Sequence, residues 1–272
     1  MKKIKKYVPF MKAGFHQAST YKLNLIFIIL GNIIGCFVSF YLWKAVFDAT
    51  DTSSFMGFNM VEMTTYVFIS FVTNSIIGCN AMTSIGEEIK DGTIAFRLLK
   101  PISYNLTFIS QEVGEKVLKI LFVFIPVTMG LEIYKYFVTG FVNLSPVHFI
   151  LYMISIVFAY LINAFFNISY GFTAFFFKNL WGSKMLKDCI VKFMSGCVIP
   201  LSFLPSILKE IFLFLPFSYI NFIPVMIYMG KYSERMMVLL ILKQVIWCLV
   251  FFIISKILWK ISSRKLCIQG GW

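Results

Sequence analysis

The stretch GEEIKDGTIAFRLLKPIS, residues 86–103, separates two long hydrophobic runs and decides how the chain is organised. It holds six charged residues, two glycines and a proline, although the chain as a whole has few charges. Asp91 followed by Gly92 is a turn signal. Residues 93–100 are compatible with a short helix, which Pro101 would end because proline cannot continue the helical hydrogen bonds. The stretch therefore predicts a compact, charged connection between two membrane-crossing segments.

The two ends of this stretch also carry helix signals. Ser84 and Glu87 are spaced like a capping box, and Ser103 can cap the helix that leads into the next hydrophobic run. Two apolar pairs are predicted to lie on one side of the short helix: Ile94 with Leu98, and Ala95 with Leu99. Such an element suits insertion into a cleft of a partner protein. A helix lying on lipid headgroups is the alternative, and composition does not separate the two.

The overall composition indicates a membrane protein. The 272 residues are 59% hydrophobic and only 14% charged, whereas soluble domains are about one quarter charged. A net charge of +13 would suit a nucleic-acid partner, but the long apolar runs exclude a soluble protein of that kind. The six cysteines include no C-x-x-C pair and the chain has two histidines, so we expect no metal site.

Six hydrophobic segments predict an all-α polytopic membrane protein that forms a single domain over residues 1–272. A helix needs about 20 residues to cross the hydrocarbon core of a bilayer. Five segments meet that length, and the fifth in order is short unless it begins near Met185. The six expected spans are residues 23–43, 64–85, 117–138, 147–177, 189–204 and 236–258.

The distribution of Lys and Arg predicts the orientation of these spans. If the amino terminus is inside, 19 of the 25 basic residues fall in inner segments and five in outer segments. Lys243 lies within the last span. Because inner loops are enriched in Lys and Arg, both termini and residues 86–103 are expected in the cytoplasm.

Residues 1–22 are expected to form an interfacial helix on the inner leaflet. Met11, Phe15 and Ala18 recur at helical spacing, with Lys12 nearby. A flexible basic tail is the alternative.

Residues 205–230 are apolar but contain three prolines, and Pro200 precedes them. Because proline interrupts helices, the pieces are too short to cross a bilayer, and we expect outer re-entrant half-helices before the last span. The alternative is that this segment adds two further full spans.

The chain shows no sign of an energy source of its own. A phosphate-binding loop of the Walker A type is absent: at the nearest approach, Gly230-Lys231, Val225 holds the first glycine position and Tyr232 follows the lysine. The ionisable residues that an ion-driven carrier would need inside the membrane are few, and Glu62 and Glu132 lie near span ends. No internal repeat is visible, which further weakens the prediction of a secondary transporter.

Residues 86–103 resemble the cytoplasmic loop of the type-2 permeases of ATP-binding-cassette (ABC) exporters in bacteria. The match to I-x-x-G-x-I-A-x-x-L-L-x-P-x-S consists of Ile89, Gly92, Ile94, Ala95, Leu98, Leu99, Pro101 and Ser103. Two further stretches fit the same subfamily in the same order: LPFSYINFIPVMIYMGK, and a basic terminal segment that ends in Gln269-Gly270-Gly271. The resemblance covers nearly the whole chain.

The resemblance implies a permease subunit that exports its substrate with ATP hydrolysed by a separate protein. The expected partners are two ABC ATPase subunits and a second permease copy or a paralogous permease, in the bacterial cytoplasmic membrane. ATP and Mg are expected on the ATPase, with no cofactor and no catalytic residue in this chain. The coupling contact is expected at Glu87, Glu88, Ile89, Lys90, Asp91, Gly92, Thr93 and Ile94, with a secondary contact at Lys184 and Lys187.

The substrate class stays open at this level. A drug, a toxic cation, an antimicrobial peptide and a lipid all suit the resemblance, and no residue decides among them. An ion-coupled secondary transporter and a non-transporting immunity or scaffold protein remain as alternative functions.

Overall fold

The computed structural model describes residues 5–20, 22–50, 54–99, 102–140, 145–177 and 181–265. Over these residues the secondary structure is helical, and the extended backbone is limited to an isolated bridge between Phe55 and Phe58. Five helices are long and apolar enough to cross a membrane: Ile29–Ala49, Met60–Lys90, Tyr104–Thr139, Pro146–Phe175 and Glu234–Ser262. The predicted all-α polytopic class is confirmed to this extent.

Each of the five long helices corresponds to one predicted segment. The first lies within α3 (Lys22–Thr50), and the second consists of α4 (Met60–Ile77) and α5 (Ala81–Lys90). The third joins α7 (Tyr104–Lys119), a π-helical turn (Ile120–Phe124) and α8 (Ile125–Thr139). The fourth consists of α9 (Pro146–Gly171) and a 3₁₀ turn (Phe172–Phe175), and the last is α13 (Glu234–Ser262).

The predicted span at residues 189–204 is wrong as a continuous helix. Helix α10 covers Trp181–Met194 and is followed by turns. Gly196 adopts a φ of 74°, a left-handed conformation that ends a helix, and Pro200 follows. The turn is held inside the protein, since the Tyr66 hydroxyl donates to the Gly196 carbonyl at 2.5 Å and the Phe222 amide donates to that of Ser195 at 2.9 Å.

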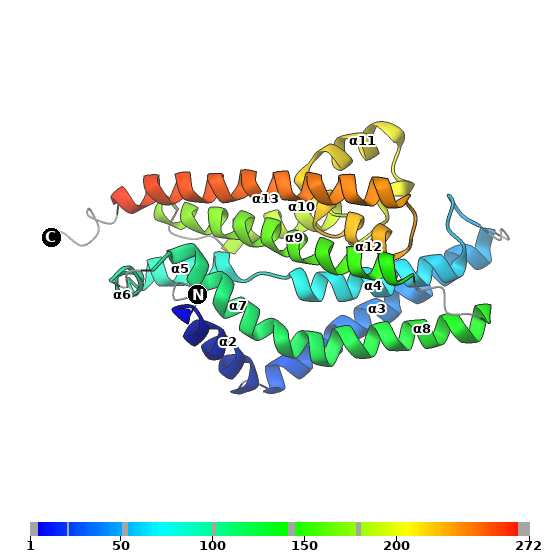
Figure 1. Ribbon diagram of the computed structural model, residues 1–272, viewed down its shortest axis with the longest axis horizontal. Helices are drawn as coiled ribbons and strands as arrows, with labels where there is room; N and C mark the ends of the chain where they lie inside the picture. The colour runs from blue at the N-terminus through cyan, green and yellow to red at the C-terminus, as the bar shows by residue number, and fades with distance from the viewer. Residues whose placement is uncertain are drawn as a thin grey trace.

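The long helices run side by side along the length of the molecule, as Figure 1 shows. Helix α13 packs along α9, and α9 also contacts α4, α5 and α12. Helices α2 (Val8–Thr20), α5 and α6 (Ile94–Leu98) gather near one end, which we call the loop end. The short helices α11 (Ser206–Phe214) and α12 (Phe222–Tyr228) lie toward the opposite end.

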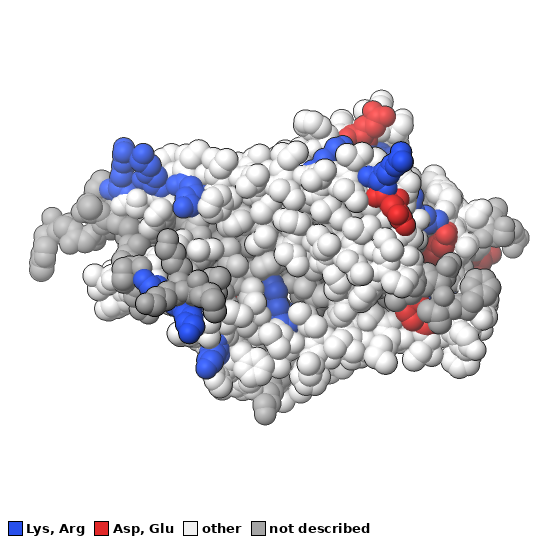
Figure 2. All heavy atoms as spheres, viewed as in Figure 1, with Lys and Arg blue, Asp and Glu red and all other residues white. Residues whose placement is uncertain are grey.

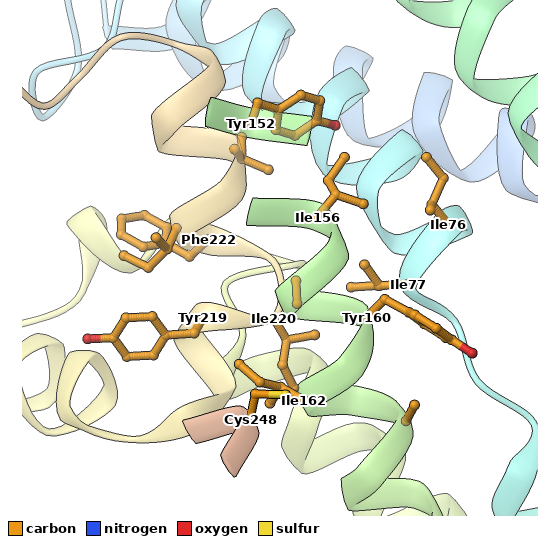
Figure 3. Packing of buried hydrophobic residues seen from close by; sticks show 14 of the residues in the cluster. Ile76, Ile77, Tyr152, Ile156, Tyr160, Ile162, Tyr219, Ile220, Phe222 and Cys248 are labelled. Atoms are coloured by element: carbon orange, nitrogen blue, oxygen red, sulfur yellow. The ribbon is translucent and has the colours of Figure 1, made fainter. Parts of the chain in front are cut away.

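Aromatic and β-branched side chains form the core around α9. Tyr152, Ile156 and Ile162 are buried on this helix. Tyr152 and Ile156 lie between Ile76 and Ile77 of α4 on one side and Phe222 on the other, and Ile162 lies near Ile220 (Figure 3). The Tyr152 hydroxyl forms a hydrogen bond with the Thr73 hydroxyl at 2.9 Å. Because α9 touches so many elements, it forms the centre of the fold.

The amino-terminal helix α2 packs directly on α7. A Cβ atom added at Gly14 would overlap the backbone carbonyl of Gln111, and one added at Gly114 would overlap that of Met11. Only glycine permits two helix backbones to approach this closely. The predicted helix within residues 1–22 is present, and Met11 and Phe15 are exposed, but its place at a membrane interface stays a prediction.

The proline-rich segment forms short helices, as predicted. Helix α11 has nine residues and follows Pro205, and α12 has seven. Every residue of α12 is buried, whereas Ile207 and Phe214 of α11 are exposed. The position of these helices relative to a bilayer stays a prediction.

Charged side chains are concentrated at the two ends of the molecule. On the face drawn in Figure 2, Lys and Arg gather at the loop end, both signs occur at the opposite end, and the broad middle is nearly uncharged. A band with few charges between two charged ends is the arrangement that a bilayer favours.

Candidate functional site

The predicted connection forms a tight helix–turn–helix at the loop end. Helix α5 ends at Lys90, Asp91 caps it, and Gly92 adopts a φ of 70° before α6 begins at Ile94. The predicted turn at Asp91 and Gly92 is therefore confirmed. Lys100, Pro101 and the Gln269-Gly270-Gly271 motif lie outside the described residues.

The predicted helix signals around this turn are only partly right. Ser103 occupies the N-cap position of α7, but its side chain makes no capping bond there. Instead its amide donates to the Tyr7 hydroxyl at 3.2 Å. The capping box at Ser84 and Glu87 is wrong, because α5 begins earlier, at Ala81, and includes both residues.

An ion pair between Glu88 and Arg97 closes the turn. Their side-chain atoms are 2.5 Å apart, and each side chain is 18% exposed. The Tyr104 hydroxyl donates to Glu88 at 3.2 Å. Arg97 also donates to the Thr107 hydroxyl at 2.9 Å, and its guanidinium lies 4.0 Å from the centre of the Phe108 ring. These five residues, which we call the Arg97 clasp, hold α5 and α6 to α7.

The residues predicted to form the coupling contact divide into two sets. Ile94 is buried, and Ile89 and Glu88 are partly buried, so these three fix the turn to the rest of the protein. The remaining five residues form the exposed tip: Glu87, Lys90, Asp91, Gly92 and Thr93. The tip is thus available to a partner.

Helix α6 also presents apolar surface. Phe96 is 71% exposed and Leu99 is 82% exposed. The prediction that Ile94 and Leu99 lie on one side is wrong, since Ile94 is buried. Because neighbouring side chains of a helix point about 100° apart, Ile94 can face the protein while Ala95, the next residue of α6, faces away from it.

The two predicted secondary contacts have partners within the chain. The Lys184 ammonium donates to the Thr83 hydroxyl at 2.8 Å. Lys187 is buried, donates to Asn167 at 2.6 Å and lies 2.8 Å from Asp188. The structure therefore places both lysines against α5 and α9, and their contact with another protein stays a prediction.

A polar cavity of about 290 Å³ lies behind the tip, between α5 and α7. Five of the twelve acidic residues of the chain line it, with Arg97 as the only basic residue: Glu87, Glu88, Asp91, Glu112 and Glu115. No motif singled out Glu112 and Glu115, which lie between residues 86–103 and the predicted span at residues 117–138. Among the described residues, no group of three His, Cys, Asp or Glu side chains could hold a metal ion.

A second cavity, of about 360 Å³, is apolar and lies between α3, α4 and α8. Phe37, Phe40, Phe68 and Phe71 line it, and its residues belong to long apolar helices. Its lining includes no Asp, Glu, His, Lys or Arg side chain.

These features define a polytopic helical membrane protein with a rigid, charged loop between its second and third long helices. Comparison with family models matches residues 17–270 to the ABC-2 family transporter protein, and the chain belongs to that family. Permeases of this family are membrane components that generally work with ATPase subunits. Comparisons with curated proteins and with solved structures find no significant match.

Proposed function

We propose that the chain is the membrane subunit of an ATP-driven exporter and that the exposed tip binds the ATPase. The observation that carries this proposal is the Arg97 clasp, which fixes a short charged turn to the ends of two long helices. A displacement of the tip by a partner would then be transmitted to the long helices rather than absorbed by a flexible loop. ATP and Mg would be bound by the ATPase, and this chain performs no covalent chemistry.

The surface of the tip suits a protein partner. Glu87, Lys90 and Asp91 are exposed beside Phe96 and Leu99, so apolar anchors lie next to charges of both signs. Interfaces of moderate size combine an apolar centre with a polar rim. A helix lying on lipid headgroups, by contrast, favours basic residues on its polar face.

We further propose that the chain crosses the bilayer six times with both termini in the cytoplasm. The fifth crossing would consist of α10 and residues 195–204. Irregular backbone at membrane depth is tolerated where protein buries it, and the Ser195–Gly196 turn is bonded to Phe222 and Tyr66. Helices α11 and α12 would then both lie on the outer side, so protease tags inserted next to Ser206 and Lys231 should both be cleaved from outside.

One observation favours an ion-coupled carrier as a second candidate. Glu112 and Lys116 are buried in a long apolar helix, and ionisable groups at such positions often bind transported ions. Transport by purified permease in liposomes with a proton gradient and no ATPase would establish that function and reject ours.

The test of the proposal is retention of an ABC ATPase of the host cell by the purified permease. Tagged permease should retain it through purification, and the complex should hydrolyse ATP. Glu87→Lys with Asp91→Lys reverses two exposed charges of the tip and should release the ATPase while the permease still inserts. The matched control, Glu210→Lys with Glu234→Lys, reverses two exposed charges on α11 and α13 and should retain it. Failure of the wild-type permease to retain any ATPase would refute the proposal.

A further inference from the structure

The second long helix is interrupted immediately before the segment that carries the tip. Helix α4 ends at Ile77 and α5 begins at Ala81, and Gly78 has φ −49° and ψ 137°. No proline lies in this stretch, and the φ of Gly78 is open to any residue. The break is therefore not imposed by a proline or by a left-handed glycine, and the surrounding side chains contribute to it.

Three polar side chains from two other helices hold the backbone of the break. The side-chain amide of Asn163 donates to the backbone carbonyl of Ile77 at 2.8 Å, and the Lys116 ammonium donates to the backbone carbonyl of Gly78 at 2.6 Å. The backbone amide of Asn80 donates to the Glu112 carboxylate at 2.7 Å. Backbone groups buried away from water require such partners, so these side chains replace the bonds that a continuous helix would make.

A second layer of contacts orients these three side chains. The Tyr160 hydroxyl donates to Glu112 at 3.1 Å, and the Lys116 ammonium lies 4.4 Å from the centre of the Tyr160 ring. Figure 3 shows Tyr160 beside Ile77, at the end of α4. Asn167 donates to Asn163 at 2.9 Å and accepts from Lys187 at 2.6 Å. The network thus joins α7, α9 and α10 to the break.

The same backbone groups have a second possible set of partners. In a continuous α-helix, the amide of Asn80 would donate to the carbonyl of Ile76, and the carbonyls of Ile77 and Gly78 would accept from Ala81 and Met82. The segment can therefore satisfy its hydrogen bonds in a bent form, with the side chains, or in a straight form, without them. Two discrete, satisfied arrangements are what a switching element requires.

We propose that residues 78–80 are a hinge between α4 and α5, and that Glu112, Lys116 and Asn163 are positioning residues that hold it bent. The proposal rests on the proposed function, because the force on the hinge would come from an ATPase bound at the tip. Displacement of the tip would turn α5 about the break, release the three side chains and straighten the second long helix.

Hydrogen–deuterium exchange of the permease–ATPase complex in lipid nanodiscs tests the hinge. In the wild type, trapping with ATP and vanadate should slow amide exchange across residues 78–82 about tenfold, because the helix closes there. Lys116→Met and Asn163→Leu remove one holding bond each, from different helices, so they should favour the straight form and slow exchange of these amides about tenfold without nucleotide. Lys119→Met, which removes a lysine three positions further along α7, should leave it unchanged.

The outcomes separate the hinge from the proposed function. If the ATPase is retained and the amides of residues 91–99 respond to nucleotide while those of residues 78–82 do not, the hinge is refuted and the proposed function stands. If both holding variants exchange like Lys119→Met, the three residues do not hold the break and the hinge is again refuted. If the wild-type permease retains no ATPase, the proposed function fails and the hinge fails with it.

Discussion

Removing Arg97 should detach the turn from α7, because this side chain supplies most of the contacts of the clasp. In Arg97→Met the aliphatic part of the side chain remains, while the ion pair with Glu88, the hydrogen bond to Thr107 and the ring contact with Phe108 are lost. Of the contacts within the clasp, Glu88 then retains only the hydrogen bond from the Tyr104 hydroxyl. Since Glu88 is 18% exposed, its carboxylate is left largely buried and without its cation.

The expected cost lies between two limits. An exposed ion pair contributes about 0–1 kcal/mol, and breaking a buried pair by removing one partner costs about 3–5 kcal/mol. The pair is mostly shielded from water, and the ring contact contributes about 0.5–1 kcal/mol more. We therefore expect local opening of the turn to become about 2–3 kcal/mol easier. At 1.4 kcal/mol for each factor of ten, this corresponds to a roughly 30- to 140-fold larger opening constant.

Amide exchange across residues 91–99 measures this opening directly. The double variant Glu88→Leu with Arg97→Met removes both charges and should recover much of the protection, because no unpaired carboxylate remains. Lys90→Met, which removes an exposed cation from the same turn, is the control and should exchange like the wild type. Exchange of Arg97→Met within threefold of the wild type, or a double variant that opens as readily as Arg97→Met, would show that the ion pair does not hold the turn.

Gly92→Val should distort the tip and weaken ATPase retention, because the φ of 70° at this position is strained for a β-branched residue; normal retention would contradict this account. Gly114→Leu should lower the thermal midpoint of the purified permease, since its backbone touches Met11, whereas Gly130→Leu, at a position with open space, should not; equal midpoints would argue against the α2–α7 contact. A cysteine at Lys184 should react only with membrane-permeant reagents and one at Met56 with impermeant reagents added outside, and the reverse pattern would overturn the orientation.

The positions of the long helices could be predicted from sequence because each depends on a run of apolar residues. The turn at Asp91 and Gly92 was equally local, since glycine alone adopts its φ without strain. The interruption of the predicted span at residues 189–204 could not be predicted from hydropathy, because Gly196 and Pro200 end the helix within an apolar run. The break at residues 78–80 was missed because its partners Glu112, Lys116 and Asn163 are 32 to 86 positions away.

The coupling residues illustrate the same limit. Sequence pattern identified the stretch, but the division between the exposed tip and the buried Ile94 depends on how α6 packs on α7. Arg97 forms the ion pair that organises the turn, and its partner Glu88 lies on the other side of that turn, outside the spacing of one helix. A capping box was also present at Asn59 and Glu62, at the start of α4, where the N-x-x-E spacing could have revealed it.

Site-specific crosslinking measures directly whether the tip contacts an ATPase. A photoreactive residue at Thr93, which is exposed on the tip, should crosslink to the ATPase in membranes of cells that express both proteins. The same residue at Phe137, exposed at the other end of the third long helix, should not. Crosslinks from Thr93 to the ATPase are the predicted result, and crosslinks from Thr93 only to lipid would contradict the account.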